Sequence, residues 1–332
     1  MLLFQVMKLI RAEHLGFCFG VRDALDLARN EASRGPLTVL GDLVHNDAVL
    51  ADLRNRGVRI ERQLEAVTTP QVLITAHGAS ERRLAEVRAR GHHVIEATCP
   101  LVRHAHQTLA QLVRQGYHPV VIGQRGHVEV VGLTGDFDGC DVVLSEAEID
   151  ALTPRARFGV VSQTTQPVAR VRALADYLRQ RFPESEVRFR DTVCQPTKQR
   201  QTAAEDLARR SDVVVVIGGT NSNNTRELVA TCRKYVSRVH HVQGADDLRP
   251  EWFGSADTVG VTAGTSTPDL VIQGVEARLR QMAEQHTRST GVEGSVLAVP
   301  ILDPALSPIA VAPVFAAVPT GPRSAAAPLQ PA

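Results

Sequence analysis

The chain has 332 residues, 43% of them hydrophobic, which is enough for two or three domains with buried cores. Its 37 basic and 36 acidic side chains leave a formal charge of +1, so no global field favours nucleic acid or an anionic membrane as a partner. The first ten residues lack the features of a secretory signal, and Met7 is a second candidate start. Five cysteines without a disulfide-like spacing favour a reducing compartment, so we expect a cytoplasmic protein.

Short runs rich in valine and isoleucine recur along the chain and predict buried parallel strands. In chain order these runs cover residues 72–75, 119–123, 158–162, 212–219 and 258–264. Amphipathic segments between them carry apolar residues at three- and four-residue spacing and predict helices. These helices cover residues 81–90, 107–115, 170–180 and 201–210. The alternation of strands and helices predicts an α/β fold.

The same layout recurs three times, at an interval of about ninety residues. Each copy opens with a cysteine, continues with an amphipathic stretch and reaches a strand that ends in glycine. Three similar units packed about one axis would bring equivalent positions together, so the thiols of Cys18, Cys99 and Cys194 are predicted to converge. The chain divides accordingly into three α/β units and a disordered tail rich in proline and alanine, over residues 7–99, 100–194, 195–287 and 288–332.

Polar side chains follow the strands of each copy. They are His45, His127 and Ser222 after the first strand, and His77, Thr164 and Ser266 after the second. Ligands of open α/β sheets bind at the carboxyl ends of strands, so these side chains are predicted to surround one crevice. Imidazoles, hydroxyls, the Asn224 amide and backbone N–H groups at helix starts suit an anion such as a diphosphate. Taken alone, Ser222, Asn224 or Ser266 is equally well explained as a helix cap.

Three cysteine thiolates are natural ligands of zinc or of an iron–sulfur cluster. Structural zinc sites usually use closely spaced pairs such as CxxC, and the sequence contains none. Three distant cysteines better suit a 4Fe-4S cluster with one iron left open for substrate. The alternatives are a zinc-dependent hydrolase with a three-cysteine site and a non-catalytic sensor of a phosphorylated metabolite. Cys140 and Cys232 lie outside the repeat, and we interpret both as structural.

Glu129 follows His127 by two residues and is a candidate proton source. A carboxyl group in a partly dry crevice beside a diphosphate and a cluster would have its pKa raised by desolvation and like charge. The alternative is a glutamate that only stabilises the first turn of a helix. Thr164 and Thr165 would supply hydroxyls close to the leaving hydroxyl of a substrate.

A resemblance to the 4-hydroxy-3-methylbut-2-enyl diphosphate reductase family, the IspH/LytB family, spans about residues 7–282. It is carried by GFCFGV, LVHN, AHG, EATCPLV, GHVEVVG, VSQTTQ, DTVC, TNSNN and VTAGTSTPD. The resemblance implies three α/β lobes in a pseudo-threefold (trefoil) arrangement around a central cluster. It further implies an oxidoreductase of isoprene biosynthesis, which converts (E)-4-hydroxy-3-methylbut-2-enyl diphosphate to isopentenyl and dimethylallyl diphosphates in the last step of the methylerythritol phosphate pathway.

By this resemblance, Cys18, Cys99 and Cys194 match the ligands of the 4Fe-4S cluster, and Glu129 matches the proton donor. The substrate-binding set is matched by His45, His77, His127, Thr164, Thr197, Ser222, Asn223, Asn224 and Ser266. Asn223 stands where many members have serine, and Val128 where proline often follows the histidine. The family implies a ferredoxin or flavodoxin as electron donor, and both a monomer and a homodimer stay open.

Overall fold

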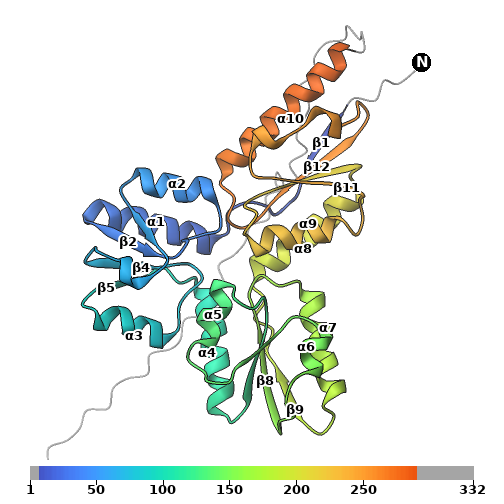
Figure 1. Cartoon of the computed structure of the whole chain (residues 1–332). Coiled ribbons are helices and arrows are strands. Elements are labelled where there is room, and N and C mark those ends of the chain that lie inside the picture. The colour runs from blue at the N-terminus through green and yellow to red at the C-terminus, as the bar shows by residue number, and fades with distance from the viewer. Residues whose placement is uncertain (1–6, 290–332) are drawn as a thin grey trace, which may run out of the picture.

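The computed structural model describes residues 7–289 and consists of three α/β lobes around a common centre (Figure 1). Each lobe is built on a four-stranded sheet, and every strand pair in the described range is parallel. The sheet orders are β3-β2-β4-β5, β7-β6-β8-β9 and β1-β12-β10-β11. The predicted α/β fold with three similar lobes is confirmed.

The first lobe contains the sheet of β2 to β5 and the helices around it. Its strands are β2 (Leu37–Leu40), β3 (Arg59–Glu61), β4 (Gln71–Ile74) and β5 (His93–Glu96). Its helices are α1 (Phe19–Arg34), α2 (Asp47–Asn55), α3 (Glu81–Ala89) and the short 3₁₀ turn Leu64–Ala66. Val39 and Leu73 on the two central strands pack with α1 in one fully buried core.

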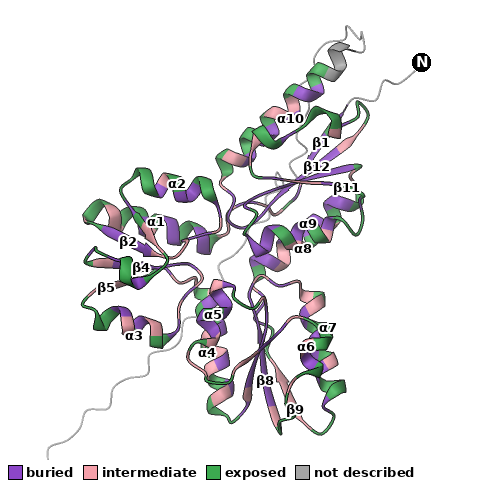
Figure 2. Cartoon of the chain, in the orientation of Figure 1, coloured by how far each residue is buried: buried purple, intermediate pink, exposed green. Residues whose placement is uncertain are grey.

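The second lobe repeats this plan. Its strands are β6 (His118–Ile122), β7 (Asp141–Val143), β8 (Arg157–Ser162) and β9 (Glu186–Phe189). Its helices are α4 (Pro100–Arg114), α5 (Val128–Thr134), α6 (Glu146–Asp150) and α7 (Val168–Arg181). Figure 2 shows buried strands at the centre of the lobe and exposed outer faces on the helices, as expected for a parallel sheet covered on both sides.

The third lobe has strands from both ends of the described chain. They are β1 (Lys8–Arg11), β10 (Val213–Ile217), β11 (Arg238–Val242) and β12 (Thr258–Ala263). Its helices are α8 (Gln195–Arg209), α9 (Asn223–Cys232), α10 (Asp269–Ser289) and the 3₁₀ turns Ala245–Asp247 and Pro250–Trp252. Val213 and Val215 of β10 pack in the core under α10, whereas Val214 and Val216 pack in the core under α8 and α9.

The N-terminal strand corrects the predicted division of the chain. Residues 7–99 were expected to form one unit, but β1 pairs in register with β12 and so lies in the sheet of the third lobe. The reason is hydrophobic burial: Leu9 packs in the core on one face of that sheet and Ile10 in the core on the other. The other predicted boundaries stay predictions.

The last element of the described range is α10. The predicted disordered tail, residues 288–332, lies outside the described residues except for 288 and 289, which end this helix. Among the helices of the described range, none has both the length and the apolar character that crossing a membrane requires.

Candidate active site

One cavity between the lobes is lined by every residue that the sequence analysis assigned to the site. The cavity and its mouth together hold about 670 Å³ of space not filled by atoms, part of it open to solvent. The residues are Cys18, His45, His77, Cys99, His127, Glu129, Thr164, Cys194, Thr197, Ser222, Asn223, Asn224 and Ser266. The structure therefore brings the whole predicted set together.

The three cysteines of the repeat each stand at the start of a helix. Cys18, Cys99 and Cys194 are the N-cap residues of α1, α4 and α8, and none of their side chains caps its own helix. The exposed N–H groups and the dipole at a helix start favour negative charge, so this arrangement suits thiolates. Cys140 and Cys232 do not line the cavity; Cys232 is fully buried in the core of the third lobe.

Close packing between α1 and the second lobe depends on Gly20. A Cβ atom on this residue would lie 2.4 Å from the Cys99 sulfur, far inside van der Waals contact. Only glycine lets the first turn of α1 approach the Cys99 thiol this closely. The Cys18 and Cys99 segments, which are 81 positions apart in the sequence, therefore meet at one side of the cavity.

Burial sets the protonation of the thiols. It raises the pKa of Cys194 to about 11 and also raises that of Cys99, so both thiols stay protonated near neutral pH. The Cys194 thiol donates to the Thr197 hydroxyl at 3.1 Å. A positively charged centre such as iron stabilises the thiolate form, so this donor set fits a metal cluster. Within the described range, no group of three or more His, Cys, Asp or Glu side chains is placed to hold a single metal ion.

Three imidazoles form a cluster at the strand ends. The ring centroids of His45 and His77 are 4.6 Å apart, and those of His45 and His127 are 5.3 Å apart. Burial lowers the pKa of His77 well below its usual value, helped by the other two rings, and burial lowers that of His127 to about 4. Burial also lowers the pKa of His45, so all three rings are neutral near pH 7. A bound anion would favour their protonated forms.

Two of these imidazoles have a buried nitrogen without a protein partner, Nδ1 of His77 and Nε2 of His127. The Nδ1 atom of His127 accepts a hydrogen bond from the backbone N–H of Glu129 at 3.2 Å. The neutral His127 ring therefore carries its hydrogen on Nε2, as a free donor. Buried donors without a partner are costly, which indicates a site built for an acceptor-rich ligand.

The loop before α9 lies next to His45 and adds donors to the cavity. Ser222 caps α9, and its Oγ accepts from the backbone N–H of Thr225 at 3.3 Å. Asn224 accepts from the backbone N–H of Thr265 at 3.0 Å, which leaves its buried Nδ2 donor without a protein partner. Ser222 therefore is a helix cap, which was the alternative explanation from the sequence. Its side chain also lines the cavity.

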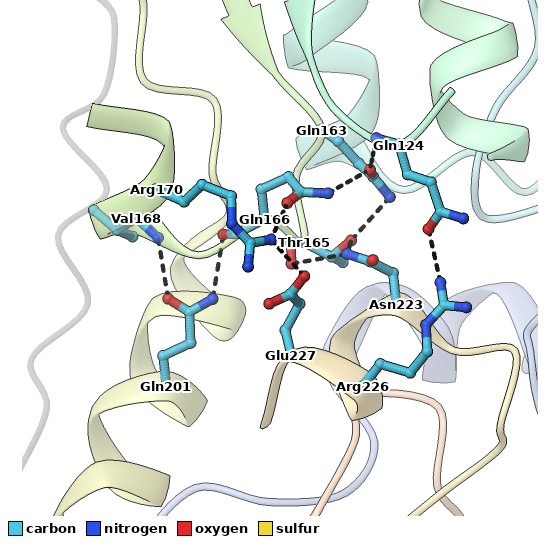
Figure 3. Close-up of polar contacts among 10 residues, drawn as sticks. All are labelled: Gln124, Gln163, Thr165, Gln166, Val168, Arg170, Gln201, Asn223, Arg226 and Glu227. Atoms are coloured by element: carbon cyan, nitrogen blue, oxygen red, sulfur yellow. Dashed lines mark hydrogen bonds and ion pairs between the residues drawn. The ribbon is translucent and has the colours of Figure 1, made fainter. Parts of the chain in front are cut away.

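Asn223 uses its side chain differently from its neighbours. Its Nδ2 group donates to the carbonyl oxygen of Thr165 at 3.2 Å and to the Thr165 hydroxyl at 3.1 Å (Figure 3). The ion pair of Arg170 with Glu227, at 2.7 Å, joins the same two lobes. Asn223 thus bridges the second and third lobes beside the site.

Substitution of Asn223 by serine is expected to lower the melting temperature by about 2–4 °C, because serine is too short to reach Thr165 and about 1 kcal/mol of hydrogen bonding is lost. Thermal unfolding followed by circular dichroism measures this shift. The control is Asn221→Ser, at an exposed asparagine of the same loop, which should leave the melting temperature unchanged. Equal melting temperatures for Asn223→Ser and wild type would show that the bridge contributes no stability.

Glu129 is the acidic residue of the site. Its carboxylate is 1% exposed and accepts from the backbone N–H of Thr164 at 2.6 Å and from the Thr164 hydroxyl at 2.9 Å. Burial raises the pKa of Glu129 to about 7, although the two hydrogen bonds from Thr164 oppose this rise. A carboxyl group with this pKa, in contact with a hydroxyl that lines the cavity, is suited to hold and deliver a proton.

Arg200 is a buried residue close to the site that the sequence analysis did not predict. It lies on α8, on the same face as Ala203, Ala204 and Leu207, at the three- and four-residue spacing of an apolar helix face. An arginine within such a face is the sequence signal that could have identified it.

Comparisons with known proteins agree with this geometry. The "LytB protein" family matches residues 9–280. The 4-hydroxy-3-methylbut-2-enyl diphosphate reductase of Aquifex aeolicus is 35% identical over 285 residues, which cover 84% of this chain and 98% of that protein. The corresponding reductase of Pelobacter propionicus is 36% identical over 282 residues, covering 84% and 100%.

Two solved structures are similar over most of the chain. The E-1-hydroxy-2-methyl-but-2-enyl-4-diphosphate reductase of Plasmodium falciparum has a TM-score of 0.77 and 25% identity, covering 83% of this chain and 88% of that one. A structure of (E)-4-hydroxy-3-methyl-but-2-enyl diphosphate reductase, described as the terminal enzyme of the non-mevalonate pathway, has a TM-score of 0.61 and 35% identity, covering 83% and 99%. The chain therefore belongs to the LytB family of 4-hydroxy-3-methylbut-2-enyl diphosphate reductases.

Proposed function

We propose that the chain reductively removes the hydroxyl group of (E)-4-hydroxy-3-methylbut-2-enyl diphosphate and releases isopentenyl and dimethylallyl diphosphates. This is the last step of the methylerythritol phosphate route to isoprenoids. The observation that supports it most is one cavity in which three thiols, three neutral imidazoles and a buried carboxyl group meet in a member of this family. The reaction takes up two electrons and two protons, breaks the C–O bond and releases water.

Cys18, Cys99 and Cys194 would hold a 4Fe-4S cluster, one thiolate from each of three helix starts. When bound, the cluster supplies the electrons and, at the iron without a cysteine, a Lewis-acidic position for the substrate oxygen. The protein's part would be to present three thiolates from separate helices to the cavity that the polar side chains also line.

The polar wall would bind the diphosphate. His45, His77 and His127 become donors when an anion favours their protonated forms, and His127 has a free Nε2 donor even when neutral. Asn224 offers its unpartnered Nδ2 group, and Ser266 offers a hydroxyl at the strand end. A diphosphate held here leaves the organic part of the substrate to extend towards the thiols across the cavity.

Glu129 and Thr164 would deliver the proton. The carboxyl group of Glu129 contacts the Thr164 hydroxyl, and both line the cavity. A protonated Glu129 can therefore supply the proton that turns the leaving hydroxyl into water, through the Thr164 hydroxyl. The Thr197 hydroxyl lies 3.1 Å from the Cys194 sulfur, so once Cys194 is a thiolate this hydroxyl would donate to it and hold it beside the substrate.

For the electron supply we propose a small one-electron donor protein, a ferredoxin or flavodoxin. The cytoplasmic location and the choice between monomer and homodimer stay predictions.

Anaerobic purification followed by iron and sulfide analysis, absorption spectroscopy and electron paramagnetic resonance tests this function. We expect a cluster whose spectrum changes when the diphosphate substrate is added, and turnover when a reductant is present. Zinc in place of iron, together with hydrolysis of the substrate, would favour the hydrolase. Tight binding without loss of water from the ligand would favour the sensor.

A further inference from the structure

Arg200 lies in the interior of the protein, on helix α8, and is only 6% exposed. Its Nε and Nη2 groups donate to the carbonyl oxygen of Gly16 at 3.1 and 2.7 Å. Its Nη1 group donates to the carbonyl oxygen of Pro196 at 3.0 Å. Gly16 stands two residues before Cys18, and Pro196 two residues after Cys194. The guanidinium therefore connects the backbone segments that carry two of the three cysteines.

This guanidinium has no acidic partner. Among the side chains that the structure describes, no Asp or Glu carboxylate pairs with it, and its acceptors are the two carbonyl oxygens. Fully buried arginines are normally paired with a carboxylate, because a cation removed from water without a counter-charge is costly. The site therefore contains positive charge that its own residues do not neutralise.

Two cysteines of the site would place negative charge near Arg200 once they are thiolates. Burial lowers the pKa of Arg200, and negative charge on Cys18 and Cys194 acts in the opposite direction. A guanidinium stays protonated even when buried, because its pKa starts far above neutral pH. Arg200 is therefore a permanent cation beside two residues that become anionic when they ligate a metal.

The contact with Gly16 also has a structural reason. Gly16 adopts φ +71°, and a Cβ atom there would lie 2.7 Å from the Cδ1 atom of Ile272. Only glycine tolerates this left-handed turn. The turn takes the chain from β1 in the third lobe to Cys18 at the start of the first lobe. Arg200 therefore binds the segment that connects these two lobes, through its hydrogen bonds to the Gly16 carbonyl oxygen.

We propose that Arg200 is a positioning residue of the cluster site, which fixes the Cys18 and Cys194 segments relative to each other and offsets the negative charge of the thiolate-held cluster. Each electron that enters such a cluster makes it more negative, so a fixed cation beside it raises the reduction potential. The inference rests on the proposed function, since it assumes the cluster.

Two substitutions of Arg200 separate its charge from its hydrogen bonds. Arg200→Gln keeps an amide donor and removes the charge, whereas Arg200→Lys keeps the charge and removes the planar fork of donors. The matched control is Arg22→Gln, which removes a half-exposed arginine whose charge also acts on Arg200. Each protein is reconstituted anaerobically with iron and sulfide. The midpoint potential of its cluster is then measured by redox titration followed by electron paramagnetic resonance.

We expect Arg200→Gln to lower the ratio of reduced to oxidised cluster about tenfold at a fixed potential, a shift of about 59 mV for one electron. Arg200→Lys and Arg22→Gln should stay close to wild type. If Arg200→Gln loses its cluster while Arg200→Lys keeps it, the result supports the same conclusion, since the two variants differ in charge.

Three results would overturn the inference. They are an unchanged potential in Arg200→Gln, an equal shift of the potential in both Arg200 variants, and an equal shift in Arg22→Gln. A wild-type protein that takes up no cluster would contradict the proposed function and this inference together. If the wild type takes up a cluster and Arg200→Gln has the same midpoint potential, the result would contradict this inference but not the proposed function.

Discussion

Replacement of Glu129 by glutamine is expected to lower kcat by about 10²–10⁴-fold and to leave substrate binding nearly unchanged. Glutamine has the same shape, and its amide can keep a hydrogen bond to Thr164, but it has no acidic proton to deliver. Steady-state turnover with a chemical reductant measures kcat, and the spectral change on substrate addition measures binding. The control is Glu184→Gln, at an exposed glutamate of the same lobe, which should behave as wild type.

The pH dependence of kcat should follow the protonation state of Glu129. Because burial raises the pKa of Glu129 to about 7, the proton-donating form is present below that pH and is lost as the pH rises through it. The kcat of the wild type should therefore fall above about pH 7, and the residual kcat of Glu129→Gln should lack this fall. A variant that keeps both a wild-type kcat and the same pH profile would show that another group delivers the proton.

Unfolding would not explain a loss of activity in Glu129→Gln. The pKa of Glu129 is higher in the folded protein than its usual value of 4.5, so the folded state holds this proton more tightly than the unfolded state. The wild type therefore loses stability as the pH rises from about 4.5 towards 7. Glutamine does not ionise, so the variant should not lose this stability as the pH rises. It should be at least as stable as wild type at pH 8, which thermal unfolding can measure.

Replacement of Cys99 by serine is expected to abolish turnover and to lower the iron and sulfide content sharply. Serine occupies nearly the same volume, but its hydroxyl stays protonated where a thiol becomes a thiolate ligand. Only two of the three proposed ligands would remain, and they stand on α1 and α8. Iron and sulfide analysis of the anaerobically purified protein, together with its absorption spectrum, measures the loss.

The control for this substitution is Cys140→Ser. Cys140 lies outside the cavity, packs against the hydrophobic core of the second lobe, and its thiol donates to the carbonyl oxygen of Asp141 at 3.8 Å. This variant should keep its cluster and its activity, so a difference between the two variants assigns the effect to the position of the thiol. Unaffected activity in Cys99→Ser would exclude this cysteine as a ligand that turnover needs.

The strands that the sequence predicts are those buried on both faces. Every predicted run overlaps a central strand, because a continuous Val/Ile run such as β10 is what a covered parallel strand requires. The edge strands β5 and β9 escape prediction, because their sequences HVIE and EVRF are short and half polar. Residues 8–11 were not predicted as a strand and were assigned to the first unit, since their partner β12 lies some 250 residues away along the chain.

The internal repeat made part of the site predictable from the sequence. Equivalent positions in the three copies identified the cysteines and the polar residues at the strand ends, whereas Thr197 and Asn223 were predicted only from the family resemblance. Two features depend instead on how the lobes pack against each other. The Asn223 amide is directed to Thr165 of another lobe, and Arg200 finds an acceptor 184 positions away in Gly16. No local pattern in the sequence specifies partners at such separations.

The cysteines at the starts of α1, α4 and α8 leave these helices without the side-chain oxygen that usually satisfies their first N–H groups. An anionic group held by the three thiols would serve as one common cap for helices of three lobes. Binding of that group is then coupled to lobe assembly, since anything that binds only the assembled state stabilises it. Cofactor supply would thus control how much of this protein is fully assembled, as well as how much is active.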